Sequence, residues 1–133
     1  MIEKIYNKND LIAIVVRAAF DGNGIEFFTD NDQLLQFGYM KRDQGYKIQP
    51  HIHKSYPRVT NGTQEVLYVK FGKVKVIFYD DNKQYVSELT ICTGDWILLA
   101  SQGHGFEFIE NSVLLEVKNG PYAGDEDKIK FTV

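Results

Sequence analysis

Two histidines, one residue apart, and a glutamate are the first residues of this chain whose types and spacing could do chemistry. His51 and His53 lie in the segment YKIQPHIH, and Glu65 opens the alternating segment EVLYVKF. Side chains two positions apart in a strand point to the same face. An extended segment over 46–53 therefore places both imidazoles side by side, and buried imidazoles need polar partners.

A third histidine is expected on the same inner surface. In the segment HGFEFI, His104 shares one face of the predicted strand with Phe106 and Phe108. In EVLYVKF, Glu65 shares its face with the apolar Leu67. A carboxylate on a core face is costly unless a cation or donor meets it. Three imidazoles and one carboxylate suit a divalent transition metal such as Fe, Mn, Ni, Co or Zn. The predicted metal ligands are His51, His53, Glu65 and His104.

Each of these residues also has an ordinary alternative role, as a surface histidine or as a solvated carboxylate at a strand end. The same holds for three candidate ligand-binding residues. Lys54 and Arg58 follow the histidine pair and could bind a phosphate or carboxylate, which a guanidinium would do bidentately. Tyr122 could line the mouth of the site. Solvated loop charges and ordinary aromatic packing are the alternatives.

The elements that must position these residues are short strands. Apolar residues alternate with a period of two, and turn residues recur every eight to twelve positions. This pattern predicts one all-β domain over 1–133, a sandwich or barrel, with a polar tail at 119–133. Trp96 is expected in its core. The predicted strands span 11–19, 25–28, 33–42, 46–53, 65–71, 73–79, 84–92, 96–100, 104–109 and 113–118.

Composition excludes several functional classes. The formal net charge is −3 and no basic run stands out, which argues against a nucleic-acid surface. The apolar run 11–16 is too short to span a membrane, and Glu3 and Asp10 before it argue against a signal peptide. Cys92 is the only cysteine, so an internal disulfide is impossible, and a small buried side chain is expected. A soluble cytoplasmic protein is predicted.

The spacing of the histidines and the glutamate resembles the first motif of the cupin superfamily, G-x5-H-x-H-x3-4-E-x6-G. Gly45, His51, His53, Glu65 and Gly72 stand in that order. Eleven residues separate the second histidine from the glutamate, where the motif has three or four. We interpret the difference as an enlarged loop at the mouth of the barrel.

The second cupin motif, G-x5-P-x-G-x2-H-x3-N, is matched in part. Gly94 begins GDWILLASQGHGF, but Ala100 replaces the proline, His104 falls one residue early, and Asn111 does not match the final asparagine. The resemblance covers about 35–118. It implies a jelly-roll β-barrel with a metal near its mouth, and a homodimer.

A second resemblance is to small sugar-nucleotide ketoisomerases and epimerases of surface-polysaccharide pathways, which are themselves cupins. The segments HIHK, 51–54, and DEDKIKF, 125–131, carry it. It implies a phosphorylated sugar or nucleotide-sugar ligand and His51 or His53 as the catalytic base next to a carbonyl. Imidazole suits that role because its ordinary pKa lies near neutrality. An iron-dependent dioxygenase with the same ligands, or a metal- or sugar-binding module without activity, are the alternatives.

Overall fold

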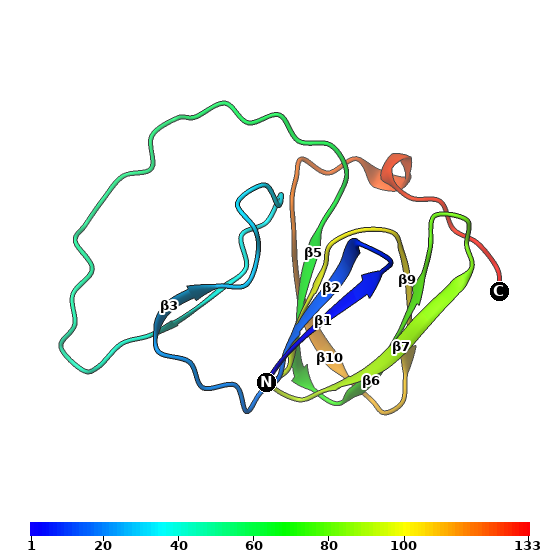
Figure 1. Cartoon of the computed structure of the whole chain (residues 1–133), viewed down its shortest axis with the longest axis horizontal. Coiled ribbons are helices and arrows are strands. Elements are labelled where there is room, and N and C mark those ends of the chain that lie inside the picture. The colour runs from blue at the N-terminus through cyan, green and yellow to red at the C-terminus, as the bar shows by residue number, and fades with distance from the viewer.

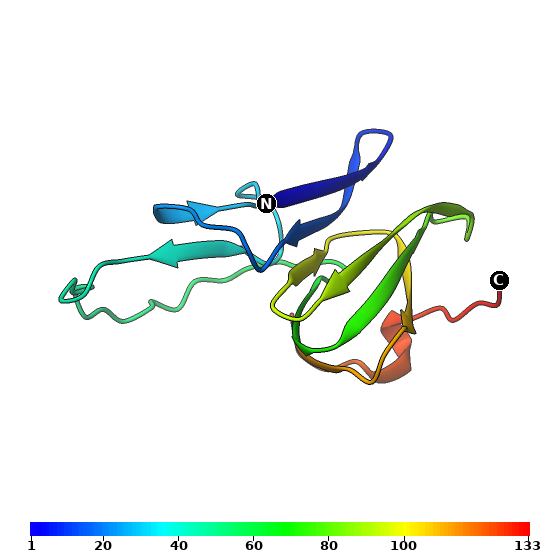
Figure 2. The same cartoon turned by 90° about the horizontal axis from the view of Figure 1, so that it is seen from below.

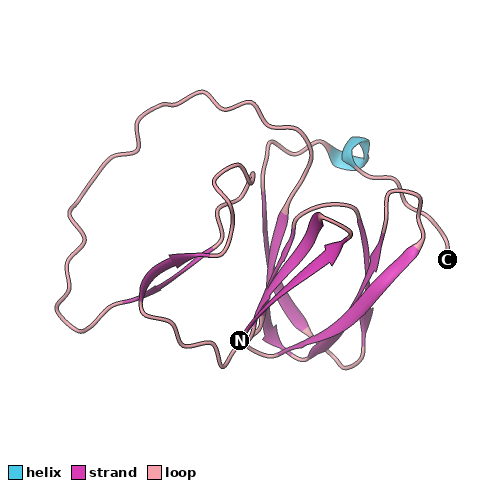
Figure 3. Cartoon of the chain, viewed as in Figure 1, coloured by secondary structure: helices cyan, strands magenta, loops and turns pink.

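The protein folds as an all-β chain, as the sequence predicts. The structure is a computed structural model that describes residues 1–133. Ten strands and one 3-10 turn follow one another along the chain (Figures 1 and 3). They are β1 (Ile2–Asn7), β2 (Asp10–Val16), β3 (Gly24–Phe27), β4 (Gly38–Lys41), β5 (Glu65–Phe71), β6 (Lys73–Tyr79), β7 (Tyr85–Cys92), β8 (Trp96–Leu99), β9 (Gly103–Phe108), β10 (Val113–Lys118) and η1 (Gly124–Asp127).

Two antiparallel sheets enclose the main core. One has the strand order β1-β2-β8-β5-β10 and the other the order β7-β6-β9, while β3 and β4 form a separate hairpin. None of the three sheets closes on itself, so the structure contains no closed barrel. The alternation read from the sequence of β6 is confirmed, because Val74, Val76 and Phe78 are buried and the residues between them are not. Burying each such side chain contributes about 1.5–3 kcal/mol.

The unbroken apolar run of β2 has a simple physical cause, because both faces of that strand are covered. Ala13 and Val15 face the core between the two sheets. Ile14 and Val16 face the opposite way and pack in a second cluster with aromatic side chains from the segment that connects β3 to β4. This smaller cluster contains Ile14, Val16, Phe28, Phe37 and Leu98.

The strand predicted over 46–53 is not formed, and the strand predicted over 33–42 shrinks to β4. Residues 42–62 contain no strand or helix, and every one of them is exposed. This segment, called here the basic arm, runs out with the β3–β4 hairpin away from the two sheets (Figures 1 and 2). An isolated extended segment has no ladder partner for its N–H and C=O groups, and Pro50 also lacks the N–H.

The N-terminal strand β1 was not predicted, because its mixture of charged and apolar residues hides the alternation. It pairs with β2 across a tight turn in which Lys8 has a φ of 56°. Two core predictions also need correction. Trp96 is 40% exposed and packs on Tyr68 with ring centroids 4.6 Å apart, because it faces outward from the five-stranded sheet. Cys92 is only half-buried.

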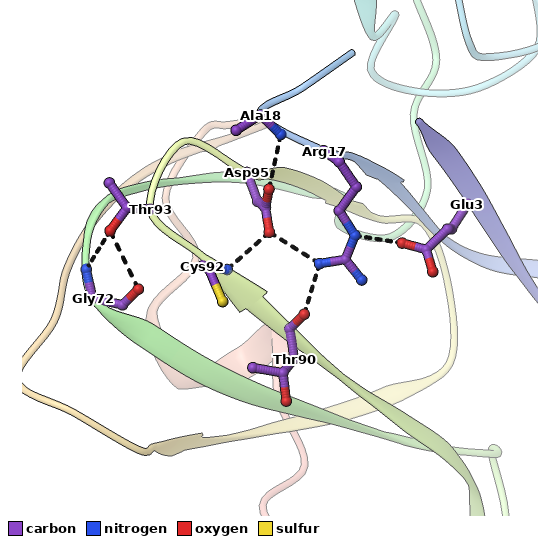
Figure 4. Close-up of polar contacts among 8 residues, drawn as sticks. All are labelled: Glu3, Arg17, Ala18, Gly72, Thr90, Cys92, Thr93 and Asp95. Atoms are coloured by element: carbon purple, nitrogen blue, oxygen red, sulfur yellow. Dashed lines mark hydrogen bonds and ion pairs between the residues drawn. The ribbon is translucent and has the colours of Figure 1, made fainter.

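A buried ion pair joins the two sheets at one end of the core (Figure 4). The Asp95 carboxylate is 5% exposed and accepts hydrogen bonds from Arg17 at 2.9 Å and from the backbone N–H groups of Ala18 at 2.9 Å and Cys92 at 2.8 Å. Arg17 also donates to the Thr90 carbonyl oxygen at 2.7 Å. Asp95 thus shapes the turn before β8, and the same residue holds β2 to β7.

The structure has no helix long and apolar enough to cross a membrane.

Candidate functional site

The candidate site is the pair formed by Glu65 and His104. Glu65 opens β5 in the five-stranded sheet, and His104 is the second residue of β9 in the three-stranded sheet. His104 lies opposite Phe78 in the β6–β9 register, so it shares the inward face of that buried residue. The two side chains meet between the sheets, with His104 Nε2 3.3 Å from Glu65 Oε2. The sequence prediction that both face the interior is confirmed.

The pair lies in an open cleft with a volume of about 1000 Å³ between the sheets. Strands β5, β6, β8 and β9 and the loops that precede β5 and β9 line it, and the C-terminal tail lies along one side. Tyr79 and Phe131 pack edge to face there, with ring centroids 5.1 Å apart. The lining also includes several polar and aromatic side chains, among them Gln64, Phe106, Glu116, Asp127, Lys128 and Lys130.

The groups around Glu65 favour the charged form of its carboxyl group. Its hydrogen bond with His104 lowers the pKa of the Glu65 carboxyl below its ordinary value, more than burial raises it. The charge of Lys118 adds to this lowering of the Glu65 pKa, with Nζ 4.0 Å from Glu65 Oε1. The Glu65 side chain is 12% exposed. A carboxylate of this kind is suited to orienting the imidazole beside it.

The lowered pKa of Glu65 makes the stability of the protein depend on pH. Because the folded pKa lies below the unfolded one, the stabilisation is complete above about pH 5 and falls as the pH drops through the folded pKa. In Glu65→Gln, the free energy of unfolding from urea titrations should therefore decline less steeply with acid than in the wild type. His104→Gln should also make the unfolding free energy depend less on pH, because it removes the imidazole that lowers the pKa of Glu65. Identical slopes in wild type and Glu65→Gln would contradict the assignment.

Gln64 fixes the start of β5 and thereby the position of Glu65. Its side chain is among the few buried polar ones, at 4% exposure. The side-chain amide nitrogen donates to the Gln33 side chain at 2.6 Å and to the Ala100 carbonyl at 3.2 Å, while its oxygen accepts from the Leu35 N–H at 2.9 Å. These bonds join β5 to the segments that precede β4 and follow β8. Sequence reasoning missed this role, because a glutamine before a strand reads as a loop residue.

The histidine pair does not reach this cleft within one copy of the chain. His51 and His53 lie in the exposed basic arm, with ring centroids 5.2 Å apart, and His51 Nδ1 is 2.9 Å from the Gln49 carbonyl oxygen. Of the four predicted ligands, the structure thus brings together Glu65 and His104 alone. No group of three or more His, Cys, Asp or Glu side chains is placed to hold a metal ion.

The three predicted ligand-binding residues also lie apart from the cleft. Lys54 and Arg58 are exposed in the basic arm, where the Arg58 guanidinium stands 5.3 Å from the centre of the Tyr56 ring. Tyr122 is 88% exposed in the tail. Within a single copy, the cations at the cleft are instead Lys118 beside Glu65 and two tail lysines, Lys128 and Lys130. The alternation of β10 could have revealed Lys118, because Leu114, Glu116 and Lys118 share one face of that strand.

Comparisons of the chain with models of known protein families, with curated proteins and with solved structures find no match.

Proposed function

We propose that the cleft binds a carbohydrate and that His104, oriented by Glu65, moves a proton next to the carbonyl group of that ligand. The observation that carries the proposal is the 3.3 Å contact between His104 Nε2 and Glu65 Oε2 inside a cleft open to small molecules. A base held by a carboxylate in this way is a recurrent arrangement in acid–base catalysis. The protein would accordingly be an isomerase or epimerase.

The geometry assigns a role to each nitrogen of the imidazole ring. With Nε2 facing the Glu65 carboxylate, that nitrogen carries the hydrogen and Nδ1 keeps its lone pair. The Nδ1 atom would take a proton from the hydroxyl-bearing carbon beside the carbonyl, while water in the open cleft protonates the carbonyl oxygen, which gives an enediol. The imidazole then returns its proton to the former carbonyl carbon while the neighbouring hydroxyl releases its proton to water and becomes the new carbonyl, which completes the isomerisation. No oxidant or reductant is consumed.

The lining of the cleft supports a hydroxyl-rich and partly charged ligand. Tyr79 and Phe106 offer apolar faces, and Glu116 and Asp127 offer carboxylate oxygens that can accept hydrogen bonds from hydroxyl groups. Lys128 and Lys130 lie at the tail side of the cleft, where a phosphate group could be held. These features favour a phosphorylated sugar or a nucleotide-sugar over an uncharged apolar ligand.

The proposed fold is a jelly roll of the cupin type, supported by two facing antiparallel sheets whose strands run in the orders β8-β5-β10 and β7-β6-β9. The metal that this resemblance implies does not fit one copy of the chain. A non-haem iron site needs two imidazoles and a carboxylate on one face, and only one imidazole lies beside Glu65. No step of the proposed reaction is assigned to a metal.

Isotope exchange tests the proposal directly. The wild-type protein is incubated in D2O with nucleotide-linked and free keto-sugars, and proton NMR follows the C–H groups beside the carbonyl. We expect protein-dependent deuterium incorporation with at least one nucleotide-linked keto-sugar. Binding by calorimetry with no exchange for any ligand would overturn the catalytic assignment and favour a sugar-binding module. The absence of both binding and exchange would overturn the proposal as a whole.

A further inference from the structure

The basic arm is unusual because it exposes apolar side chains along an extended backbone. Ile52 is 92% and Val59 95% exposed. The other large apolar residues of the arm, Tyr46, Ile48 and Tyr56, are also exposed. Single exposed apolar residues are common, but a run of them on one projecting segment marks a surface that another chain covers. The arm therefore has the character of a segment that contacts another chain.

Strand β9 is an edge strand of the three-stranded sheet, and an extended segment such as the arm could pair with it. It pairs with β6 alone, so the N–H and C=O groups of its outer side have no ladder partner. Its inward residues are His104, Phe106 and Phe108, which lie opposite Phe78, Val76 and Val74 of β6. Phe108 is nevertheless 58% exposed, because no strand follows β9 in the sheet. An added fourth strand would cover this edge and extend the wall of the cleft.

The central part of the arm has the features of such a strand. Residues 46–53 alternate so that Lys47, Gln49, His51 and His53 share one face. Pro50 cannot donate from its backbone nitrogen, which a new outermost strand tolerates because one of its sides has no partner. With the histidine face turned inward, both imidazoles would stand beside His104, and Tyr46, Ile48 and Ile52 would lie on the outer face of the extended sheet, the face that carries Glu107.

Two further uncovered surfaces favour a second copy over closure of the arm onto its own chain. The β3–β4 hairpin exposes Ile25, Phe27 and Met40. The outer face of β10 exposes Val113, Leu115 and Val117. Folding the arm back onto its own β9 would leave both surfaces bare. The arm and hairpin also project from the side of the molecule away from β9 (Figures 1 and 2).

The net charge of the basic arm is opposite to that of the rest of the chain, which also favours association with a second copy. Residues 42–62 contain four Lys or Arg and one Asp, a formal charge of +3. Because the whole chain carries −3, the remainder carries −6. At the acceptor edge, Glu107 and Glu110 lie beside Lys75 and Lys73 of their own chain, and Glu65 and Glu116 lie beside Lys118. The complementarity is therefore that of the net charges of the arm and of the remainder, which steers association between copies.

We propose that two copies of this chain exchange their basic arms, so that residues 46–53 of each pair with the free edge of β9 in the other. The exchange completes the proposed catalytic site, on which this inference builds, because each copy supplies His51 and His53 to the Glu65–His104 pair of its partner. A single copy then holds only part of the site. The partner of this protein is therefore a second copy of itself.

Cross-linking tests the exchange without any assay of activity. Three single-cysteine variants are made on a Cys92→Ser background: Ile52→Cys in the arm, Glu107→Cys on the outer face of β9, and Glu88→Cys as a control. Glu88 lies on β7, at the opposite edge of the same sheet, and Glu107 and Glu88 are both exposed glutamates. The arm variant is unfolded, mixed with each of the other two, refolded and treated with a short bismaleimide.

We expect a cross-linked product of one arm variant and one Glu107→Cys chain, at twice the chain mass of 15.3 kDa, and little product with Glu88→Cys. Light scattering of the wild type should give the same doubled mass. A chain carrying both Ile52→Cys and Glu107→Cys that cross-links only within itself would overturn the exchange, as would no product in any mixture or equal product with both partners. If the wild type incorporates deuterium into a keto-sugar and any of these three results is also obtained, only the arm exchange is overturned, and the proposed function of the Glu65–His104 pair stands.

Discussion

Replacing His104 with alanine should lower the rate of deuterium exchange into a keto-sugar by about 10²–10⁴-fold, the usual contribution of a positioned acid–base group. The Glu65–His104 contact makes this the largest expected effect on activity, because His104 is the only imidazole that its own chain places in the cleft. The rate is measured by NMR at saturating ligand. Ligand affinity is measured separately by calorimetry and should change much less than the rate.

The matched variants separate catalysis from folding. Glu65→Gln keeps the size of the side chain but removes the charge that orients the ring, so its rate should fall between those of the wild type and His104→Ala. Glu88→Gln makes the same chemical change on β7, at the edge of the three-stranded sheet away from β9, and should retain the wild-type rate. Wild-type exchange in His104→Ala would remove this residue from the mechanism.

Replacing Asp95 with alanine should lower the free energy of unfolding by about 3 kcal/mol, the lower end of the range for removing one partner of a buried ion pair. The carboxylate meets one guanidinium and two backbone N–H groups, and all three lose their acceptor. Arg17 keeps its ion pair with Glu3 and is 27% exposed, which limits the cost. For a domain with a total stability of about 5–15 kcal/mol, this loss is large.

Urea unfolding followed by fluorescence of Trp96 measures the effect of Asp95→Ala. Asp95→Asn retains one acceptor oxygen and should be less destabilised than Asp95→Ala. Asp21→Ala is the surface control, since Asp21 pairs with Lys41 with its side chain 70% exposed, and its unfolding midpoint should stay close to that of the wild type. Equal midpoints in Asp95→Ala and Asp21→Ala would show that the buried network does not hold the sheets together.

The strands with local pairing could be predicted well from the sequence. Strands β5 and β6 are joined at Gly72, which has a φ of 109°, and their alternating apolar residues predicted both the strands and their inner faces. Phe71, the last residue of β5, is an exception, at 59% exposure. Alternation shows which face of a strand is apolar, but not how far along the strand that face is covered.

The candidate site could be predicted only in part. The inward orientation of Glu65 and His104 followed from the residues beside them, and the structure brings the two together. The strand over 46–53 was expected from the same kind of pattern, and in one copy it does not form. A strand needs a neighbour, and an alternating pattern does not say which chain provides it.

The sequence by itself determined the all-β class, most of the strand positions and the inner faces that carry Glu65 and His104, because these depend on the period-two pattern of neighbouring residues. Only the tertiary structure decided the contact between Glu65 and His104, which lie 39 positions apart in the sequence. The same holds for the ion pair between Arg17 and Asp95, which lie 78 positions apart. The tertiary structure also decided that the histidine pair stands outside the cleft of its own chain. Such contacts depend on the pairing of distant strands, which residue patterns within each strand do not specify.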